Sequence, residues 1–283
     1  MASYFGAPMF VVETQTARGI RSLANAITIY IVVAILALIL PYAMYALAGQ
    51  VPSDYGPSFL AFAIGFLALF CGLLALYLVL IILAINGFWS VHKGKTEYGI
   101  AHEKDMGRAM TFFIAAIAFF FASMAVSFAS LVVSLGSLAG PAGGTSTPSP
   151  VFAVVSAVLG MLFSVMIALI LFYMVKAFTP SEKQNFGIAA AGLYVTAAVL
   201  SGIYALSLAF LPASSVLDSY ALRLVPRLIG GLLLMISLVL FLILYRDAHR
   251  RLKSHVIKPV WETMAAQYPI QAQEYRWQPP PSP

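Results

Sequence analysis

Five serine hydroxyls follow one another along one apolar stretch of the chain, and hydroxyl groups can hydrogen-bond a small neutral solute. The steps between them alternate between four and three residues, which places all five on one face of a helix: Ser123, Ser127, Ser130, Ser134 and Ser137. Such a stripe also suits a contact between two helices, because small side chains let backbones approach closely in lipid. The spacing favours the helix contact and leaves a solute pathway as the alternative.

A second row of small residues occupies the next apolar stretch. Its members repeat at steps of four residues and so share one helix face: Ser156, Gly160, Ser164 and Ala168. This spacing is typical of close helix packing within a membrane. We therefore predict that the row packs against another helix.

Two sets of basic side chains could bind anions. Arg223 and Arg227 lie four residues apart, on one helical face, and the acids expected on the same side of the membrane are Asp54 and Asp218. They predict either salt bridges or an external anion or partner-docking site. The second set follows the last apolar stretch, where positive charge would fix orientation and contact anionic lipid headgroups: Arg246, Arg250, Arg251 and Lys253.

Polar side chains that could serve a lipid-processing enzyme gather in one segment: His92, Glu97, His102, Glu103 and Asp105. Their mixed charge is more typical of a solvated helix end. The four histidines lack the spacing of a metal site, and the single cysteine, Cys71, has no cysteine partner. The chain also lacks a glycine-rich phosphate loop and a nucleophile motif. We expect no enzyme activity, no metal or other cofactor, and no nucleic-acid partner.

The elements that position these residues are membrane spans. Apolar residues make up 61% of the chain and charged residues only 9%, whereas a soluble domain has about 25% charged residues. Six stretches without a single Asp, Glu, Lys or Arg are long enough to cross a bilayer as helices: 25–47, 59–88, 109–138, 151–175, 187–211 and 228–245. The sequence predicts an all-α integral membrane bundle of six transmembrane helices.

The absence of charge inside these stretches limits the function. A charged group at the bilayer centre costs about 2.5–3.5 kcal/mol on insertion scales, so it persists where function needs it. Without such groups, a proton relay through carboxylates or a voltage sensor is not expected. A pathway for a neutral solute, lined by hydroxyls and backbone carbonyls, is compatible with this absence of charge.

Basic residues predict the orientation, because Lys and Arg in short loops stay on the cytoplasmic side. Of the 16 Lys and Arg residues, 14 fall before the first stretch or in the segments that follow the second, fourth and sixth. Both termini are therefore predicted to be cytoplasmic. The chain is predicted to divide into a cytoplasmic N-terminal segment (1–24), a six-helix domain (25–245) and a basic, aromatic and proline-rich tail (246–283). The aromatic residues of this tail would suit docking on the cytoplasmic face or on another protein.

Local signals predict where several helices begin. Thr179 and Glu182 around Pro180 match a capping box at the start of the fifth helix, and Ser149-Pro150 would open the fourth. Pro226 would start the sixth helix, and Gly230-Gly231 would loosen its outer turns.

A short repeat indicates that two helical hairpins are related by duplication. Tyr98-Gly99-Ile100-Ala101 precedes the third stretch, and Phe186-Gly187-Ile188-Ala189 leads into the fifth. Four residues are weak evidence in sequence of such low complexity.

The pattern resembles an archaeal family of polytopic membrane proteins with five or six spans and no assigned function. The resemblance rests on a lead-in from Glu13 to Leu23, on the Tyr98-Gly99-Ile100 step, and on a connection from Tyr173 to Gly187 into a helix rich in Ala and Gly. These features cover much of the chain. The resemblance implies no activity.

Two functions fit these observations. The favoured one is a non-catalytic, multi-pass protein of the cell membrane that acts by association, as a subunit or scaffold of a membrane complex. Its partners would be the lipid bilayer and other membrane subunits, or further copies of itself. The alternative is a transporter or channel for a small neutral or hydrophobic solute that uses the serine stripe.

Overall fold

The computed structural model describes residues 13–48, 57–138, 150–210 and 216–267, and for some helix ends it describes the backbone alone. These residues form helices and turns without a strand. The helices are α1 (Gln15–Ala48), α2 (Pro57–Lys93), α3 (Ile100–Leu138), α4 (Pro150–Lys176), α5 (Ser181–Phe210), α6 (Val216–Lys253) and α7 (Val260–Gln267). Six of them are long and apolar enough to cross a membrane. The predicted all-α fold with six membrane helices is confirmed.

The helices form an open arc rather than a closed ring. Along the arc, each helix packs on the next in the order α2, α1, α6, α5, α4, α3. Although α2 and α3 follow each other in the chain, they make very few contacts. One contact between them is the stacking of Phe88 on Phe113, with ring centroids 4.3 Å apart. The arc therefore has a gap between its two end helices.

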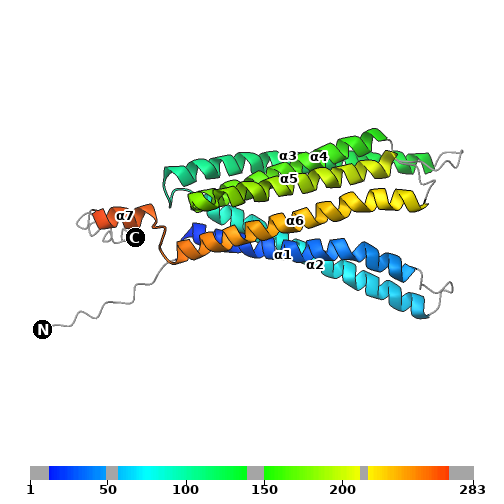
Figure 1. Cartoon of the computed structure of the whole chain (residues 1–283), viewed down its shortest axis with the longest axis horizontal. Coiled ribbons are helices and arrows are strands. Elements are labelled where there is room, and N and C mark those ends of the chain that lie inside the picture. Colours follow the sequence, from blue (N-terminus) through cyan, green and yellow to red (C-terminus); the bar gives the residue numbers. More distant parts are fainter. Residues whose placement is uncertain (1–12, 49–56, 139–149, 211–215, 268–283) are drawn as a thin grey trace, which may run out of the picture.

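The two ends of the bundle differ. We call the end that holds the start of α1 and the end of α6 the base, and the opposite end the mouth. Toward the mouth, the pair α1 and α2 diverges from α3, α4 and α5 (Figure 1). The largest fully buried side chains include Ile20, Val91, Met106 and Tyr245, which lie in the helix segments nearest the base. The tight core is thus at the base.

Glycines bring neighbouring helices close together at several points. A Cβ on Gly19 of α1 would lie 2.7 Å from the backbone oxygen of Gly87 on α2. On α6, a Cβ on Gly230 would lie 3.3 Å from the carbonyl oxygen of Ala197, and one on Gly231 would lie 2.9 Å from Leu38 Cδ1. Gly230 and Gly231 therefore let α6 pack between α5 and α1, and they do not mark a loosened turn.

Two predictions about helix starts are wrong. The sixth helix begins at Val216, so Pro226 lies inside it. A proline inside a membrane helix is tolerated when neighbouring groups satisfy the freed backbone carbonyl. The Thr179 hydroxyl donates to the carbonyl of Val175, 2.9 Å away, at the end of α4. It therefore completes α4, and α5 begins at Ser181. The predicted start of α4 at Pro150 is confirmed.

The short sequence repeat does not correspond to a structural repeat. Gly99 has a left-handed backbone with φ of 89° in the turn before α3, whereas Gly187 lies within α5 and packs against Phe172. The two hairpins also differ, because α4 and α5 pack along each other while α2 and α3 do not.

Candidate functional site

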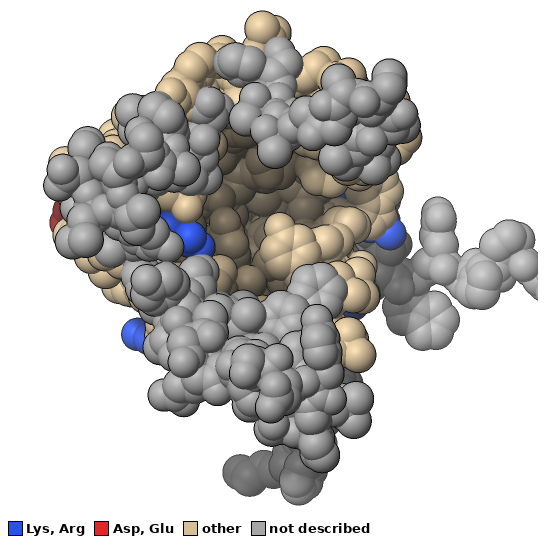
Figure 2. Space-filling view, turned by 90° about the vertical axis from the view of Figure 1, so that its right-hand side faces the viewer, with Lys and Arg blue, Asp and Glu red and all other residues tan. Residues whose placement is uncertain are grey.

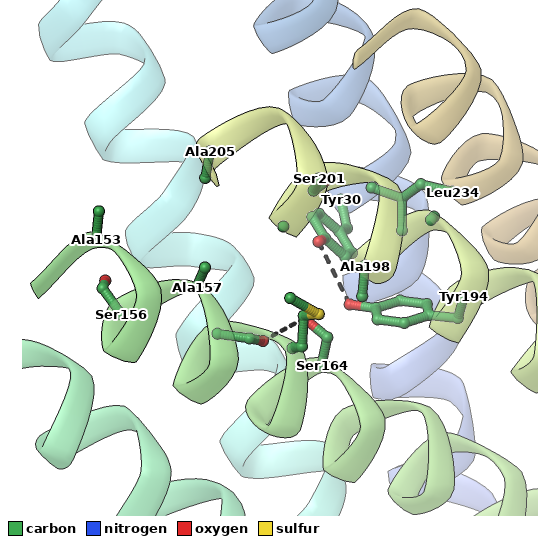
Figure 3. A pocket seen from close by; sticks show the side chains of 14 residues that line it. Tyr30, Ala153, Ser156, Ala157, Ser164, Tyr194, Ala198, Ser201, Ala205 and Leu234 are labelled. Atoms are coloured by element: carbon green, nitrogen blue, oxygen red, sulfur yellow. Dashed lines mark hydrogen bonds between the residues drawn. The ribbon is translucent and has the colours of Figure 1, made fainter. Parts of the chain in front are cut away.

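An inner cavity lies on the concave side of the arc. Its volume is about 470 Å³, and α4 and α5 supply most of its lining, with Tyr30 from α1 and Leu234 from α6 (Figure 3). Seen from the mouth, the molecule is hollowed between its helices (Figure 2). None of the lining residues is charged. The cavity therefore suits an apolar occupant.

Small residues dominate the two long walls of this inner cavity. Ser156, Gly160 and Ser164 of α4 line it, opposite Ser201 and other small residues of α5. Within the described residues, no heavy atom outside the local helix lies within 4 Å of where a Cβ on Gly160 would be. The small row of α4 was predicted to pack on another helix, and here it faces the cavity. Only Ala168, at the base end of the row, is completely buried.

Hydroxyl groups give the inner cavity a modest polarity. The oxygens of Tyr30 and Tyr194 lie 3.4 Å apart across α1 and α5. The Ser164 hydroxyl donates to the backbone oxygen of Gly160 in its own helix, at 2.9 Å. Such a bond satisfies the hydroxyl locally. The two tyrosines therefore bring a pair of hydroxyl groups from different helices together at the cavity.

The serine stripe of α3 is separate from this inner cavity. Ser123, Ser127 and Ser130 are not among the residues that line it. Ser127 is exposed, and Ser123 and Ser130 are half-buried. The side chains of Ser134 and Ser137 lie outside the described residues. A pathway through the cavity would thus use α1, α4 and α5 in place of the predicted stripe.

The outer arginines are described only in part. Arg227 lies over the ring of Tyr204, with its Cζ 5.5 Å from the ring centroid, and its Nη1 is 3.5 Å from the tyrosine oxygen. Asp54 and the side chains of Arg223 and Asp218 lie outside the described residues. The anion or salt-bridge site stays a prediction.

The basic residues at the end of α6 separate into three environments. Arg251 lies 3.3 Å from Asp247, which also binds Lys183 of α5 at 3.0 Å. Arg246 and Arg250 are exposed. Lys253 lines a second cavity at the base.

The polar segment that runs from the end of α2 to the start of α3 performs structural tasks that the sequence did not indicate. Glu97 accepts hydrogen bonds from the backbone N–H groups of Gln15 and Thr16, each at 3.0 Å, so it caps the start of α1. Its own carbonyl accepts the N–H of Val260 at 2.8 Å, which docks α7 on the base. The nearby Thr14 hydroxyl accepts the N–H of Ala17, a local cap that the Thr14-x-x-Ala17 spacing could have signalled.

Tyr98 and His102 form a partly aromatic cluster beside Glu97. The Tyr98 hydroxyl lies 2.9 Å from Thr14 Oγ1. Burial raises the pKa of Tyr98, and the hydrogen bond with Thr14 opposes this. His102 is 1% exposed and packs against Phe178, with ring centroids 4.7 Å apart. Neither of its ring nitrogens has a hydrogen-bond partner in the described structure.

The other members of the polar segment have different neighbours. Asp105 lies 3.6 Å from Arg108 and 3.9 Å from Lys176. His92 packs against the rings of Phe88 and Trp89, and Glu103 is exposed. Across the described ranges, no three His, Cys, Asp or Glu side chains come together as metal ligands would. These contacts support structural tasks more directly than a shared catalytic one.

Comparisons with models of known protein families, with curated proteins and with solved structures find no match. The resemblance to an archaeal family of polytopic membrane proteins therefore stays a prediction.

Proposed function

We propose that this multi-pass membrane protein acts by association, as a subunit or scaffold of a membrane complex. In this proposal, a transmembrane helix of another subunit packs on the concave side of the arc and inserts side chains into the inner cavity. The observation that carries it is the small-residue row of α4, whose central Gly160 has open space opposite it.

The surfaces of α2 and of the inner cavity suit different neighbours in the membrane. The exposed face of α2 carries large apolar side chains that suit lipid tails, such as Leu74, Leu78 and Ile82. The walls of the inner cavity carry small residues, which favour an approaching backbone. The gap between α2 and α3 offers a helix a lateral entrance from the bilayer.

The test fills the inner cavity and compares it with a matched glycine. Gly160→Leu places a large side chain in the cavity, and Gly72→Leu makes the same change on exposed α2, where a Cβ also has open space. Each protein is purified from native membranes in mild detergent through a C-terminal tag, and the mass and subunit composition are measured. We expect a stoichiometric partner with the wild type and with G72L, and its loss with G160L.

A photo-reactive amino acid at position 160 identifies the occupant directly, with position 72 as the control. Cross-links to a membrane segment of a different protein at position 160, and not at 72, support the proposal. Cross-links between identical chains would place a second copy in the cavity. A monomer without cross-links would overturn the association.

A second candidate function is transport or binding of a small neutral or hydrophobic solute. The specific observation behind it is the pair of tyrosine hydroxyls from two helices, in a cavity without charge. Binding of a neutral solvatochromic dye to the purified protein would be compared in Tyr30→Phe/Tyr194→Phe and Ser127→Ala/Ser130→Ala. Weaker binding in the tyrosine variant alone would support the cavity, and weaker binding in the serine variant alone would support the α3 stripe. Dye binding at the wild-type level in both variants would contradict this candidate.

A further inference from the structure

A second cavity lies at the base, where the start of α1 meets the end of α6. Its volume is about 640 Å³, and its lining includes Arg21 of α1, His249 and Lys253 of α6, His255, and Glu13. Arg21 and Lys253 lie in the two helices that bound the membrane domain. The cavity therefore lies at the end of the bundle where the first candidate membrane span begins and the sixth ends.

The charges that line this basal cavity are unbalanced. Arg21 and Lys253 are exposed. Across the described residues, neither has a carboxylate within 4.0 Å. By contrast, Lys183 and Arg251 both bind Asp247. The cavity lining thus holds two permanent cations and one acid, Glu13. A bound anion would supply the missing negative charge.

The two histidines of the basal cavity are held in defined positions. His249 Nδ1 lies 3.2 Å from the carbonyl oxygen of Ala17. Because a carbonyl only accepts hydrogen bonds, Nδ1 carries the hydrogen, and Nε2 is the nitrogen left for another partner. His255 lies 3.1 Å from Glu262 through its own Nδ1.

An unusual helix end sets the position of His255. Its backbone has φ of 53°, in the left-handed region that favours glycine. The N–H of Val256 bonds the carbonyl of Arg251 at 3.1 Å, and the N–H of His255 bonds that of Leu252 at 3.4 Å. These bonds form a Schellman cap, which satisfies carbonyls that would otherwise repel an anion. The imidazole is therefore fixed at a turn where glycine is the usual residue.

We propose that the basal cavity binds a phosphate-bearing anion, either the headgroup of an anionic phospholipid or a free phosphate compound. Arg21 supplies a planar pair of N–H donors and Lys253 supplies a mobile charge, the two side chains that proteins use for phosphate. The site takes one residue from the basic set recognised in the sequence and adds Arg21, which lies far from it in the chain. It does not depend on what occupies the inner cavity.

The test measures ligand binding to the full chain by native mass spectrometry in detergent. The probes are phosphatidylglycerol, phosphatidylcholine and inorganic phosphate, each added alone. Arg21→Gln/Lys253→Gln is compared with Arg18→Gln/Lys104→Gln, which removes the same charges from exposed positions that do not line the cavity. A melting curve for each variant confirms that it is folded.

We expect the wild type and the control to bind phosphatidylglycerol in preference to phosphatidylcholine. We expect the Arg21/Lys253 variant to bind it about thirtyfold more weakly, because each of the two basic residues near a headgroup contributes about 1 kcal/mol and about 1.4 kcal/mol corresponds to a factor of ten. Phosphate adducts that require the same two residues would point to a free phosphate compound, and binding of lipid alone would point to a headgroup. Equal binding by both variants, or no preference for the anionic lipid, would overturn the proposal.

Discussion

At the scale of single residues, His102 is the most unusual side chain in the base. It is almost completely buried, and neither of its nitrogens has a described partner. A buried polar group without a hydrogen bond costs about 1–3 kcal/mol. Its neighbours are the rings of Tyr98 and Phe178. An apolar ring would therefore suit this environment better.

We predict that His102→Phe raises the free energy of unfolding by about 1 kcal/mol, because it removes an unsatisfied group and keeps the ring packing. Thermal melting in detergent, followed by tryptophan fluorescence, measures the change. Tyr98→Phe serves as the control of opposite sign, since it removes a hydrogen bond to Thr14. A clear loss of stability in H102F would mean that a water or ion satisfies the imidazole.

Glu97 is the residue on which three segments of the base converge. It caps α1 with its side chain and holds α7 with its backbone. Replacing a cap by alanine costs about 0.5–2 kcal/mol. We predict a lower melting temperature for Glu97→Ala, and an unchanged one for Glu103→Ala, whose side chain is exposed. Equal melting of the two variants would show that the cap contributes nothing.

The sequence could identify Glu97 as a polar loop residue but not as a cap. Its partners lie more than 80 positions earlier in the chain, at Gln15 and Thr16. Only the packing of α1 against α2 brings these groups together. The sequence likewise could not show that Arg21 and Lys253 share a cavity.

At the scale of helices, the sequence predicted which segments span the membrane but not which faces they bury. Hydropathy located every long helix, because lipid requires continuous apolar runs. The faces were not predictable, since lipid and protein core are almost equally apolar and leave little periodic contrast. The row of Ser156, Gly160 and Ser164 illustrates this. Its small-residue spacing was evident, while its position on an inner cavity depends on the curvature of the arc.

Replacement by alanine should have opposite effects on stability at Gly19 of α1 and Gly72 of α2. We predict that Gly19→Ala destabilises the protein, because its Cβ would lie 2.7 Å from the backbone oxygen of Gly87. Overpacking costs about 1–3 kcal/mol, and better helix propensity returns about 1 kcal/mol. Gly72→Ala gains the propensity without the clash, so it should melt at the same or a higher temperature. Equal melting temperatures for the two variants would contradict this prediction and would mean that α1 and α2 can shift to accommodate the added Cβ.

At the scale of the whole molecule, the start of α1 and the end of α6 lie at the same end of the bundle, because the number of long helices between them is even. The distribution of Lys and Arg predicts that this base faces the cytoplasm. The open arc was not predictable from the sequence, because it depends on which helices pack together.

Cysteine labelling tests the predicted orientation. Cys71→Ser removes the natural thiol, and single cysteines then replace Lys104 or Lys258, which are exposed at the base. In sealed, right-side-out vesicles, we predict that an impermeant maleimide labels neither position until the membrane is permeabilised. Labelling of both in intact vesicles would reverse the orientation.

The order of contacts along the arc has a consequence for biosynthesis. Of the described helices, α6 is the one that packs extensively on both α1 and α5, so it joins the α1–α2 pair to the α3–α4–α5 group. It also follows α1 to α5 in the chain, so it leaves the ribosome after them. Until then, the first two helices pack on each other but lack the contacts of α1 with α6. A chain that stops after α5 would therefore present a quality-control machinery with two separate helical groups, even though five of the six candidate spans in the described residues had been inserted.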